Sequence, residues 1–397
     1  MSQPEVPFFS ATGAAFGVDL LACMATVVQQ GRYVLGPRVQ AFELAFASYL
    51  GVAHAVGVAN GTDALTLSLR ALGIGPGERV LTAANAGCYA STAIAQAGAE
   101  PLYVEIDPQD MNLAPAAVEQ ALKAGPVAAV ILTHLYGQMA PVERIAAACR
   151  AACVPLIEDC AQAHGAARNG RKAGAWGALA CFSFYPTKNL GALGDGGLVA
   201  TADAALAERV RALRQYGWSG KYQVTLPGGI NSRLDELQAA LLLAKLPHLD
   251  RANAERRAIA ARYQAAFADL PLRLPPSMGS DYVAHLYVVR TPRRAELQAH
   301  LARHGIASEV HYPLPEHRQP VRSERAYDLG ASGQVAKTCL IEGERRGSKG
   351  DGGLSLPVTE AACAEVLSLP CCLGLTSTQT ARVIDGVRAF FNRESAC

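Results

Sequence analysis

The chain has 397 residues, half of them hydrophobic, which is enough for one large domain and a smaller one with buried cores. Its 36 lysines and arginines nearly balance its 34 aspartates and glutamates, so nucleic acid is poorly supported as the main partner. Residues 1–13 do not look like a secretory signal and no apolar run reaches the roughly 20 residues of a membrane helix, which predicts a cytoplasmic protein without a membrane partner.

Between His54 and Thr201, short apolar runs alternate with helix-like stretches. This pattern is typical of βα units around a largely parallel sheet. The expected strands are 55–59, 79–82, 101–106, 127–133, 154–157, 178–184 and 197–201. The expected helices between them are 62–72, 89–97, 114–123 and 141–152.

After residue 203 the pattern becomes helical, and residues 233–270 predict one long helix or two, with Pro247 as the interruption. A smaller α+β unit follows, with expected strands at 285–290 and 306–310 and helices at 293–304 and 379–391. Residues 331–356 are rich in Gly, Ser, Lys and Arg and predict an exposed loop. We therefore expect an N-terminal arm and large domain over residues 1–250 and a small domain over residues 251–397.

The eleven cysteines are scattered and form neither CxxC pairs nor a Cys/His cluster with ligand spacing. This usage indicates reduced thiols rather than a disulfide framework. We therefore expect no metal site.

In an open parallel sheet, functional groups collect at the carboxyl ends of the strands. Residues 60–63 (Asn-Gly-Thr-Asp) follow an expected strand and begin a helix, so backbone N–H groups and the helix dipole would favour an anion. An ordinary helix cap supplied by Thr62 or Asp63 also explains this motif.

Glu158 and Asp159 directly follow the expected strand 154–157. A carboxylate at the mouth of a sheet holds a heterocyclic nitrogen in its protonated form, because the charge pair favours the cation. The alternative for Asp159 is a cap on a local loop.

Residues 183–189 (SFYPTKN) leave a strand and run into a glycine-rich loop, with Lys188 as the one lysine. A lysine amine becomes a nucleophile when its pKa, about 10.4 in water, is lowered by partial burial or nearby positive charge. A surface lysine without a function is the alternative.

Together the three segments supply an anion cradle, an acid for a ring nitrogen and an amine for an aldehyde, which are the groups that a pyridoxal phosphate site requires. The sequence contains neither a P-loop lysine motif nor a complete GxGxxG. The usual nucleotide-hydrolysing and dinucleotide-binding sites are thereby excluded.

The sequence closely resembles the sugar-nucleotide aminotransferases of the DegT/StrS class, which have the fold of aspartate aminotransferase (fold type I). The resemblance runs from about Gly31 to Phe391. It implies an α/β fold with a mostly parallel seven-stranded sheet between helices and a smaller C-terminal α+β domain. The segments that carry it are NGTDALTLSLRALGIGPGERV, HLYGQMAPV, LIEDCAQAHGA, CFSFYPTKNLGALGDGG, NSRLDELQAALLLAKLPHLD and HYPLP.

The resemblance also assigns roles to individual residues. It implies that Lys188 carries pyridoxal 5'-phosphate as a Schiff base and later moves a proton, and that Asp159 pairs with the pyridine nitrogen. Gln162 would lie near the cofactor's 3-hydroxyl and Tyr89 over its face. The implied phosphate cup consists of Ser183 and the backbone of Gly61 and Thr62.

In the same way, Asn231 matches an asparagine that reaches the cofactor phosphate of the neighbouring subunit. This implies a homodimer whose active sites are shared between subunits. The candidate substrate residues are Tyr185, Arg233, His311 and Tyr312.

The implied reaction is a transamination in two halves. An amino acid, usually L-glutamate, leaves its nitrogen on the cofactor as pyridoxamine 5'-phosphate, and a keto group on an NDP-linked deoxyhexose collects it, giving an amino-sugar nucleotide for glycan or secondary-metabolite biosynthesis. Lys188 favours transamination, because the related sugar dehydratases carry histidine there.

The sequence of residues 85–89 (NAGCY) resembles the branch of the class that acts on 3-keto sugars and so favours a 3-keto sugar, with a 4-keto sugar as the alternative. The alternative from another class is a regulatory protein that binds the cofactor without turnover. An insertion around 331–353 departs from the class and either shapes the sugar pocket or extends into solvent.

Overall fold

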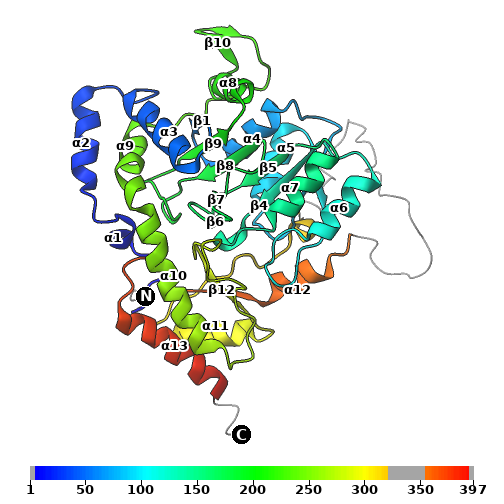
Figure 1. The fold of residues 1–397 in the computed structure, drawn as a ribbon. Helices are drawn as coiled ribbons and strands as arrows, with labels where there is room; N and C mark the ends of the chain where they lie inside the picture. Colours follow the sequence, from blue (N-terminus) through cyan, green and yellow to red (C-terminus); the bar gives the residue numbers. More distant parts are fainter. Residues whose placement is uncertain (1–4, 321–353, 393–397) are drawn as a thin grey trace.

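The computed structural model describes residues 5–320 and 354–392 (Figure 1). Seven strands form its main sheet, in the order β1-β9-β8-β5-β4-β2-β3. β9 is antiparallel to β1 and β8, whereas the other neighbours pair in parallel, which confirms the largely parallel sheet. The bounds are β1 His54–Val58, β2 Arg79–Thr82, β3 Glu100–Tyr103, β4 Ala129–Thr133, β5 Leu156–Asp159, β8 Leu179–Ser183 and β9 Gly197–Thr201.

Helices cover both faces of this sheet. Side chains alternate along a strand, so in β4 Val130 and Leu132 enter one core while Ala129 and Ile131 enter the other. The first face is covered by α3 (Pro37–Leu50), α6 (Pro115–Ala124), α7 (Val142–Ala151) and α9 (Glu236–Lys245). The second face is covered by α4 (Gly61–Ala71), α5 (Tyr89–Ala97) and α8 (Ala204–Leu213).

A third core lies beside the main sheet, where α10 (Leu249–Phe267) runs down to the C-terminal part of the chain (Figure 1). There β12 (Tyr287–Arg290) pairs antiparallel with β13 (Val366–Leu369), and α11 (Arg294–Arg303) and α13 (Ser377–Asn392) pack against them. Val6 of the N-terminal arm joins this core and donates its N–H to the carbonyl of Gly305 at 3.0 Å. The arm therefore packs on the C-terminal unit, and the division at residue 250 stays a prediction.

The expected strand 306–310 is wrong. Ile306 forms only an isolated bridge to Val6, and Glu309 only one to Ser368. The strand that completes the small sheet is β13, whose short apolar run the sequence pattern did not separate from its neighbours. The expected strand 101–106 also ends early, because Ile106 leaves the sheet to bridge Leu113.

Other elements were not predicted from the sequence. They are α1 (Ala11–Ala14), α2 (Leu20–Gln30), α3, α12 (Pro357–Glu365) and the hairpins β6 (Ala167–Arg168) with β7 (Arg171–Lys172) and β10 (Trp218–Gly220) with β11 (Gln223–Val224). Single turns of 3-10 helix occur at Leu135–Gly137, Leu246–His248 and Glu316–Arg318. The second contains Pro247 and separates α9 from α10, which confirms two helices in residues 233–270.

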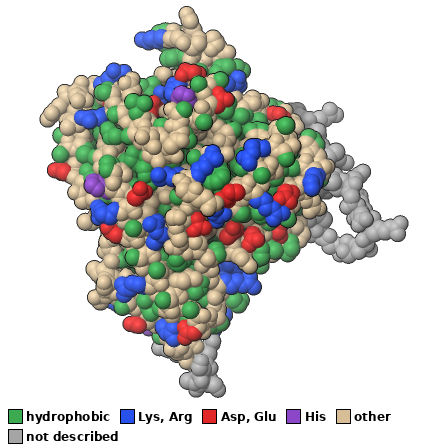
Figure 2. Space-filling view, in the orientation of Figure 1, with side chains coloured by type: hydrophobic (Ala, Val, Ile, Leu, Met, Phe, Trp, Pro, Cys, Tyr) green, Lys and Arg blue, Asp and Glu red, His purple; other side chains and the backbone are tan. Residues whose placement is uncertain are grey.

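Most of the expected loop 331–356 lies outside the described residues. Among the helices that the structure does describe, none is long and apolar enough to cross a membrane. Lys and Arg side chains are interspersed with Asp and Glu over the face shown in Figure 2, as the near-zero net charge leads one to expect.

Candidate active site

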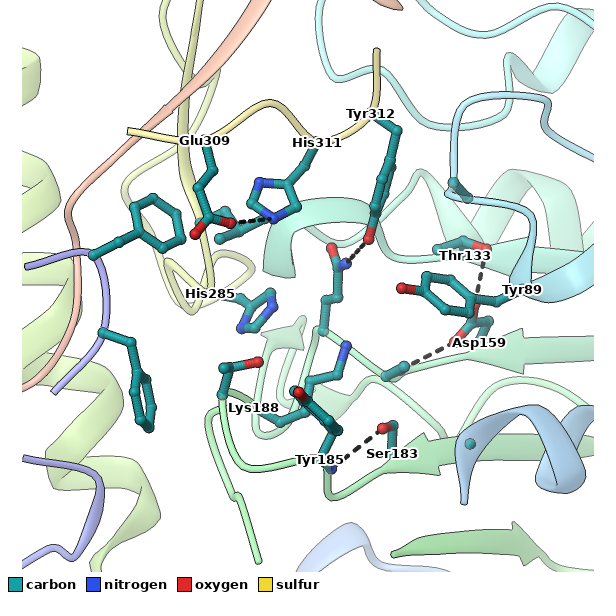
Figure 3. Close-up of a pocket in the computed structure, with 18 of the residues that line it drawn as sticks. Tyr89, Thr133, Asp159, Ser183, Tyr185, Lys188, His285, Glu309, His311 and Tyr312 are labelled. Atoms are coloured by element: carbon teal, nitrogen blue, oxygen red, sulfur yellow. Dashed lines mark hydrogen bonds and ion pairs between the residues drawn. The ribbon is translucent and has the colours of Figure 1, made fainter. Parts of the chain in front are cut away.

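A cavity of about 710 Å³ opens at the carboxyl ends of the central strands (Figure 3). Thr133 ends β4, Asp159 ends β5 and Ser183 ends β8, and all three line it. The opposite wall comes from the N-terminal arm and residues 309–312. This volume lies in the range of small-molecule sites, which are roughly 300–1,000 Å³.

Lys188 is presented by a tight loop that follows β8. Its backbone N–H donates to the carbonyl of Tyr185 at 2.8 Å, and Ala192 N–H donates to Phe184 at 2.7 Å. A Cβ at Gly191 would lie 2.4 Å from the carbonyl oxygen of Pro186, so the loop closes only with glycine there. Burial lowers the pKa of the Lys188 amine to about 8, although Asp159 opposes that shift.

The residue after the lysine is fixed by three contacts. Asn189 donates its amide N–H to Asn253 Oδ1 at 2.8 Å and to the Val283 carbonyl at 3.0 Å. Its Oδ1 lies 3.0 Å from Nδ1 of His285, a cavity residue whose pKa burial holds well below the ordinary histidine value. The loop and its lysine are therefore held by contacts to both α10 and the segment before β12.

Asp159 is buried, and its side chain points into the same space as that of Lys188 (Figure 3). Thr133 Oγ1 donates to Asp159 Oδ2 and the N–H of Ala161 donates to Oδ1, both at 3.1 Å. Burial nevertheless raises the pKa of this carboxyl, although these hydrogen bonds and Lys188 lower it. A cation placed against Asp159 would stabilise its ionised form.

Glu158, the other residue of the acidic pair, has a structural role. It accepts hydrogen bonds from His134 Nε2 at 3.0 Å and from the N–H groups of Gly174, Trp176 and Gly177 at 2.6–2.8 Å. Its carboxylate therefore ties a loop to the end of β5, and its oxygens are occupied by these hydrogen bonds. The ligand atoms of His134, Glu158 and Cys160 lie within 4.8 Å of one another, but the carboxylate of Glu158 already accepts from these N–H donors.

The start of α4 lies against the end of β8. Asn60 caps the helix by accepting from Asp63 N–H at 2.8 Å, so the alternative in which Thr62 or Asp63 is the cap was wrong. A Cβ at Gly61 would lie 2.7 Å from the Cβ of Ser183, which leaves this wall lined by backbone. The first N–H groups of a helix together with a hydroxyl such as that of Ser183 can hold an anion.

Gln162 is oriented at both ends of its amide. Its Oε1 accepts from Tyr136 N–H at 2.6 Å, and its Nε2 donates to the Tyr312 hydroxyl at 3.2 Å. The Tyr312 ring meets Tyr89 edge-on at 6.2 Å, and the half-exposed Tyr89 borders the cavity. These aromatic rings form one side of the cavity beside Gln162.

His311 is held on the opposite wall. Its Nδ1 lies 2.9 Å from Ser368 Oγ, its Nε2 lies 3.4 Å from Glu309, and Phe8 stacks on its ring. Burial, with a contribution from Lys188, lowers its pKa to about 4. His311 is therefore neutral at pH 7 and able to accept or donate one proton.

The profile of the DegT/DnrJ/EryC1/StrS aminotransferase family matches residues 17–342. The chain belongs to this family. The chain is 41% identical to a dTDP-3-amino-3,4,6-trideoxy-alpha-D-glucose transaminase of Streptomyces venezuelae. The alignment covers 98% of this chain and 97% of the relative. The chain is also 40% identical over 94% of its length to a dTDP-3-amino-3,6-dideoxy-alpha-D-galactopyranose transaminase of Aneurinibacillus thermoaerophilus, with 95% of that protein covered.

Solved structures of aminotransferases superpose on this chain over nearly its whole length. The crystal structure of S. venezuelae DesV in complex with a ketimine intermediate matches with a TM-score of 0.87 at 41% identity, covering 98% of this chain and all of DesV. NtdA from Bacillus subtilis with bound PMP matches at 0.85 and 26% identity, covering 99% of this chain and 86% of NtdA. The enzyme therefore has the fold of PLP-dependent aminotransferases and uses that cofactor.

The cavity of the aminotransferase contains most of the residues expected at its site. Those that line it are Gly61, Thr62, Tyr89, Asp159, Gln162, Ser183, Tyr185, Lys188, His311 and Tyr312. Asn231 and Arg233 do not line it: Asn231 is exposed and bridges Gln215, and Arg233 is half-buried just before α9.

Several other residues at the site of this aminotransferase were not expected from the sequence. Thr133 donates to Asp159, and His285 contacts Asn189, the residue after Lys188. Phe8 and Arg256 also line the cavity. Thr133 ends a predicted strand, so its position was a signal that could have been used. The other three are brought in by distant segments and carry no local motif.

Proposed function

We propose that the chain transfers an amino group from an amino acid, with L-glutamate as the first choice, to the 3-keto group of a dTDP-linked deoxyhexose. The observation that carries the proposal is Lys188 beside Asp159 in one cavity, with the Gly61 and Ser183 cradle at its edge. Support for the 3-position comes from the relatives at 41% and 40% identity, whose names describe 3-amino sugars.

The residues of this cavity fit pyridoxal phosphate. Gly61, Thr62 and Ser183 would hold the phosphate, and Asp159 would hold the ring nitrogen as a cation. When bound, the cofactor supplies an aldehyde that exchanges the amino group and a protonated ring that accepts electrons. The amine of Lys188 is a base with a pKa of about 8, suited to carrying a proton to and from a substrate carbon near neutral pH.

The test of this function is turnover. Purified protein would be incubated with L-glutamate and a panel of 3-keto and 4-keto sugars on thymidine, uridine and guanosine diphosphates, and the amino sugars identified by mass spectrometry and NMR. Amination at carbon 3 supports the proposal, and exclusive amination at carbon 4 contradicts the 3-keto assignment. Bound cofactor without any turnover would favour the regulatory alternative, which matches the name of a relative, the "Pleiotropic regulatory protein" of Geobacillus stearothermophilus, at 40% identity.

We further propose that two copies of the chain share their sites, with Asn231 serving the phosphate of the neighbouring copy. Supporting this is the exposure of Asn231 outside its own chain's cavity. It is carried next to the β10–β11 hairpin, whose Tyr222 and Val224 expose 75% and 63% of their surface. Exposed apolar side chains gathered on a projecting hairpin are typical of a contact surface.

Shared sites predict complementation between two inactive variants. Lys188→Ala and Asn231→Ala homodimers are each expected to be impaired, but a hybrid contains one complete site. Unfolding and refolding an equal mixture should restore roughly a quarter of the wild-type rate, since half of the dimers are hybrid and each has one complete site. If the mixture were no more active than the average of the two variants, Asn231 would act within its own chain or not at all.

The phosphate cradle predicts a specific effect of adding one methyl group. Gly61→Ala would place a Cβ 2.7 Å from that of Ser183 and is expected to weaken pyridoxal phosphate affinity by about tenfold or more, because crowding costs roughly 1–3 kcal/mol. Gly75→Ala is the control, since its Cβ would have no neighbour closer than 3.7 Å. Fluorescence titration of the apoprotein measures both affinities, and equal values would place the phosphate elsewhere.

The lowered pKa of Lys188 predicts the pH dependence of cofactor uptake. The amine reacts with an aldehyde only when unprotonated, and below a pKa of about 8 that fraction falls about tenfold per pH unit. The uptake rate of the apoprotein should therefore rise about tenfold from pH 6 to pH 7 and level off above pH 8. Stopped-flow absorbance measures this rate, and a midpoint near pH 10 would show that burial does not lower the pKa.

A further inference from the structure

Arg256 is a buried cation on the wall of the active-site cavity. It lies on α10, is 5% exposed and lines the same cavity as Lys188. Its Nη1 donates to the carbonyl of Cys371 at 2.7 Å, and its buried Nε has no hydrogen-bond partner. Among the residues that the structure describes, no carboxylate forms an ion pair with it.

Such a guanidinium is costly without an anion. Buried charges in proteins are normally paired and hydrogen-bonded on all sides, because removal from water is otherwise uncompensated. Burial accordingly lowers the pKa of Arg256. A single carbonyl at Cys371 satisfies one of its five N–H groups and leaves its charge unpaired.

A purely structural role does not require this charge. Arg256 ties α10 to the segment after β13, but Tyr263 on the same helix already does so by donating its hydroxyl to the carbonyl of Pro370 at 2.8 Å. A neutral side chain at position 256 would avoid the cost of burying a cation. The position of Arg256 on a ligand-sized cavity supplies a reason for the charge.

The surroundings of Arg256 favour an anion. The ionisable groups near it include His285, which is neutral because its pKa is far below the ordinary value, and Lys188 is close enough to both histidines of the wall to depress their pKa values. Glu309 also lines the cavity, but its side chain is exposed and lies 3.4 Å from Nε2 of the neutral His311, and it forms no ion pair with Arg256. The guanidinium of Arg256 therefore has no ion-pair partner among the residues that the structure describes.

We propose that Arg256 binds a carboxylate of the amino-acid donor and so holds its amino group in the cavity that contains Lys188. A guanidinium and a carboxylate match in shape and form two parallel N–H···O bonds, which orient the ligand as well as hold it. The inference rests on the proposed aminotransferase function and adds the group that recognises the donor. The donor's amino group and Cα would then lie in the cavity that Lys188 and Asp159 border.

The test separates the two halves of the reaction. Arg256→Met keeps an unbranched side chain as far as the position of Nε and removes the guanidinium charge. Arg256→Lys keeps the charge without the fork, and Arg262→Met is an exposed control on the same helix. The donor half is followed by the loss of cofactor absorbance with L-glutamate or L-glutamine. The acceptor half is started from protein loaded with pyridoxamine phosphate and followed with the keto-sugar nucleotide alone.

Arg256→Met is expected to raise the glutamate concentration for half-maximal rate by about 10- to 100-fold, the range for loss of a charged hydrogen-bonded contact. Arg256→Lys should fall between it and wild type, and the acceptor half should change less than threefold. Equal losses with glutamate and glutamine would assign the α-carboxylate, and a loss confined to glutamate would assign the side-chain carboxylate. Should Arg256→Met fail to fold, Arg256→Lys decides by the same comparison.

Two results would overturn the inference. Equal losses in both halves would mean that Arg256 only supports the fold, and a loss confined to the acceptor half would mean that it binds the sugar diphosphate. Failure of the proposed function is distinguishable from these, because then the wild-type cofactor band would not respond to any amino acid. In that case no donor exists and the inference falls with the function.

Discussion

Lys188→Ala is expected to abolish transamination, with a loss on the order of 10³-fold or more, because one side chain supplies both the nucleophile and the base. Nothing else among the described residues of the cavity replaces it. His285 and His311 also line the cavity, and burial holds the pKa of each well below the ordinary histidine value. The measurement is the rate of amino-sugar formation from glutamate, with absorbance spectra of both proteins.

The spectra give this experiment its control. The variant should still bind pyridoxal phosphate through the cradle, but its absorbance should be that of the free aldehyde and should not bleach with glutamate. Lys123→Ala, an exposed lysine at the end of α6, should behave as wild type. A Lys188→Ala protein that keeps even a tenth of the wild-type rate would show that the proton carrier is another residue.

The regular parts of this fold follow from local sequence. Strands β2, β4, β5, β8 and β9 lie where short apolar runs end in polar residues, and Thr133, Asp159 and Ser183 close three of them at one edge. A site at the carboxyl ends of those strands therefore follows from the amino-acid pattern alone. The same reasoning failed at residues 306–310, because β-propensity alone does not show whether a neighbouring strand is available.

The opposite wall of the site was not predictable in this way. Phe8, Arg256, His285 and Cys371 reach the cavity from four segments that are far apart in the sequence. Their spacing contains no period or motif, since the contacts among them arise only when α10 and the C-terminal unit pack beside the sheet. Arg256 in particular looks like one more charge on an amphipathic helix until burial is known.

The resemblance to a known family supplied roles that spacing alone left open. Gln162 is an example, because the sequence shows only an amide after a strand, whereas the structure shows its two ends fixed by Tyr136 and Tyr312. Asn231 is the opposite case. A single chain leaves it outside the cavity, so its role depends on a second copy and on the complementation experiment.

Asp159→Asn is expected to lower kcat on the order of 10²- to 10³-fold while leaving the fold intact. Asparagine has nearly the same shape: its Oδ1 can still accept from Ala161 N–H, and its Nδ2 can donate to the Thr133 hydroxyl. It has no charge, so it cannot hold a ring nitrogen in its protonated form, and the ring would accept electrons poorly. Rates of both half-reactions measure the loss, and both should fall because both need the protonated ring.

Stability separates this effect from damage to the fold. The folded pKa of Asp159 is raised by burial above its unfolded value, so the ionised carboxyl destabilises the apoprotein at neutral pH. Asp159→Asn should therefore keep or raise the apoprotein's Tm, as should the exposed control Asp385→Asn, which alone keeps full activity. An Asp159→Asn protein with a wild-type rate would mean that the charge of Asp159 is not needed, and the assignment of the ring nitrogen to this carboxylate would have to be withdrawn.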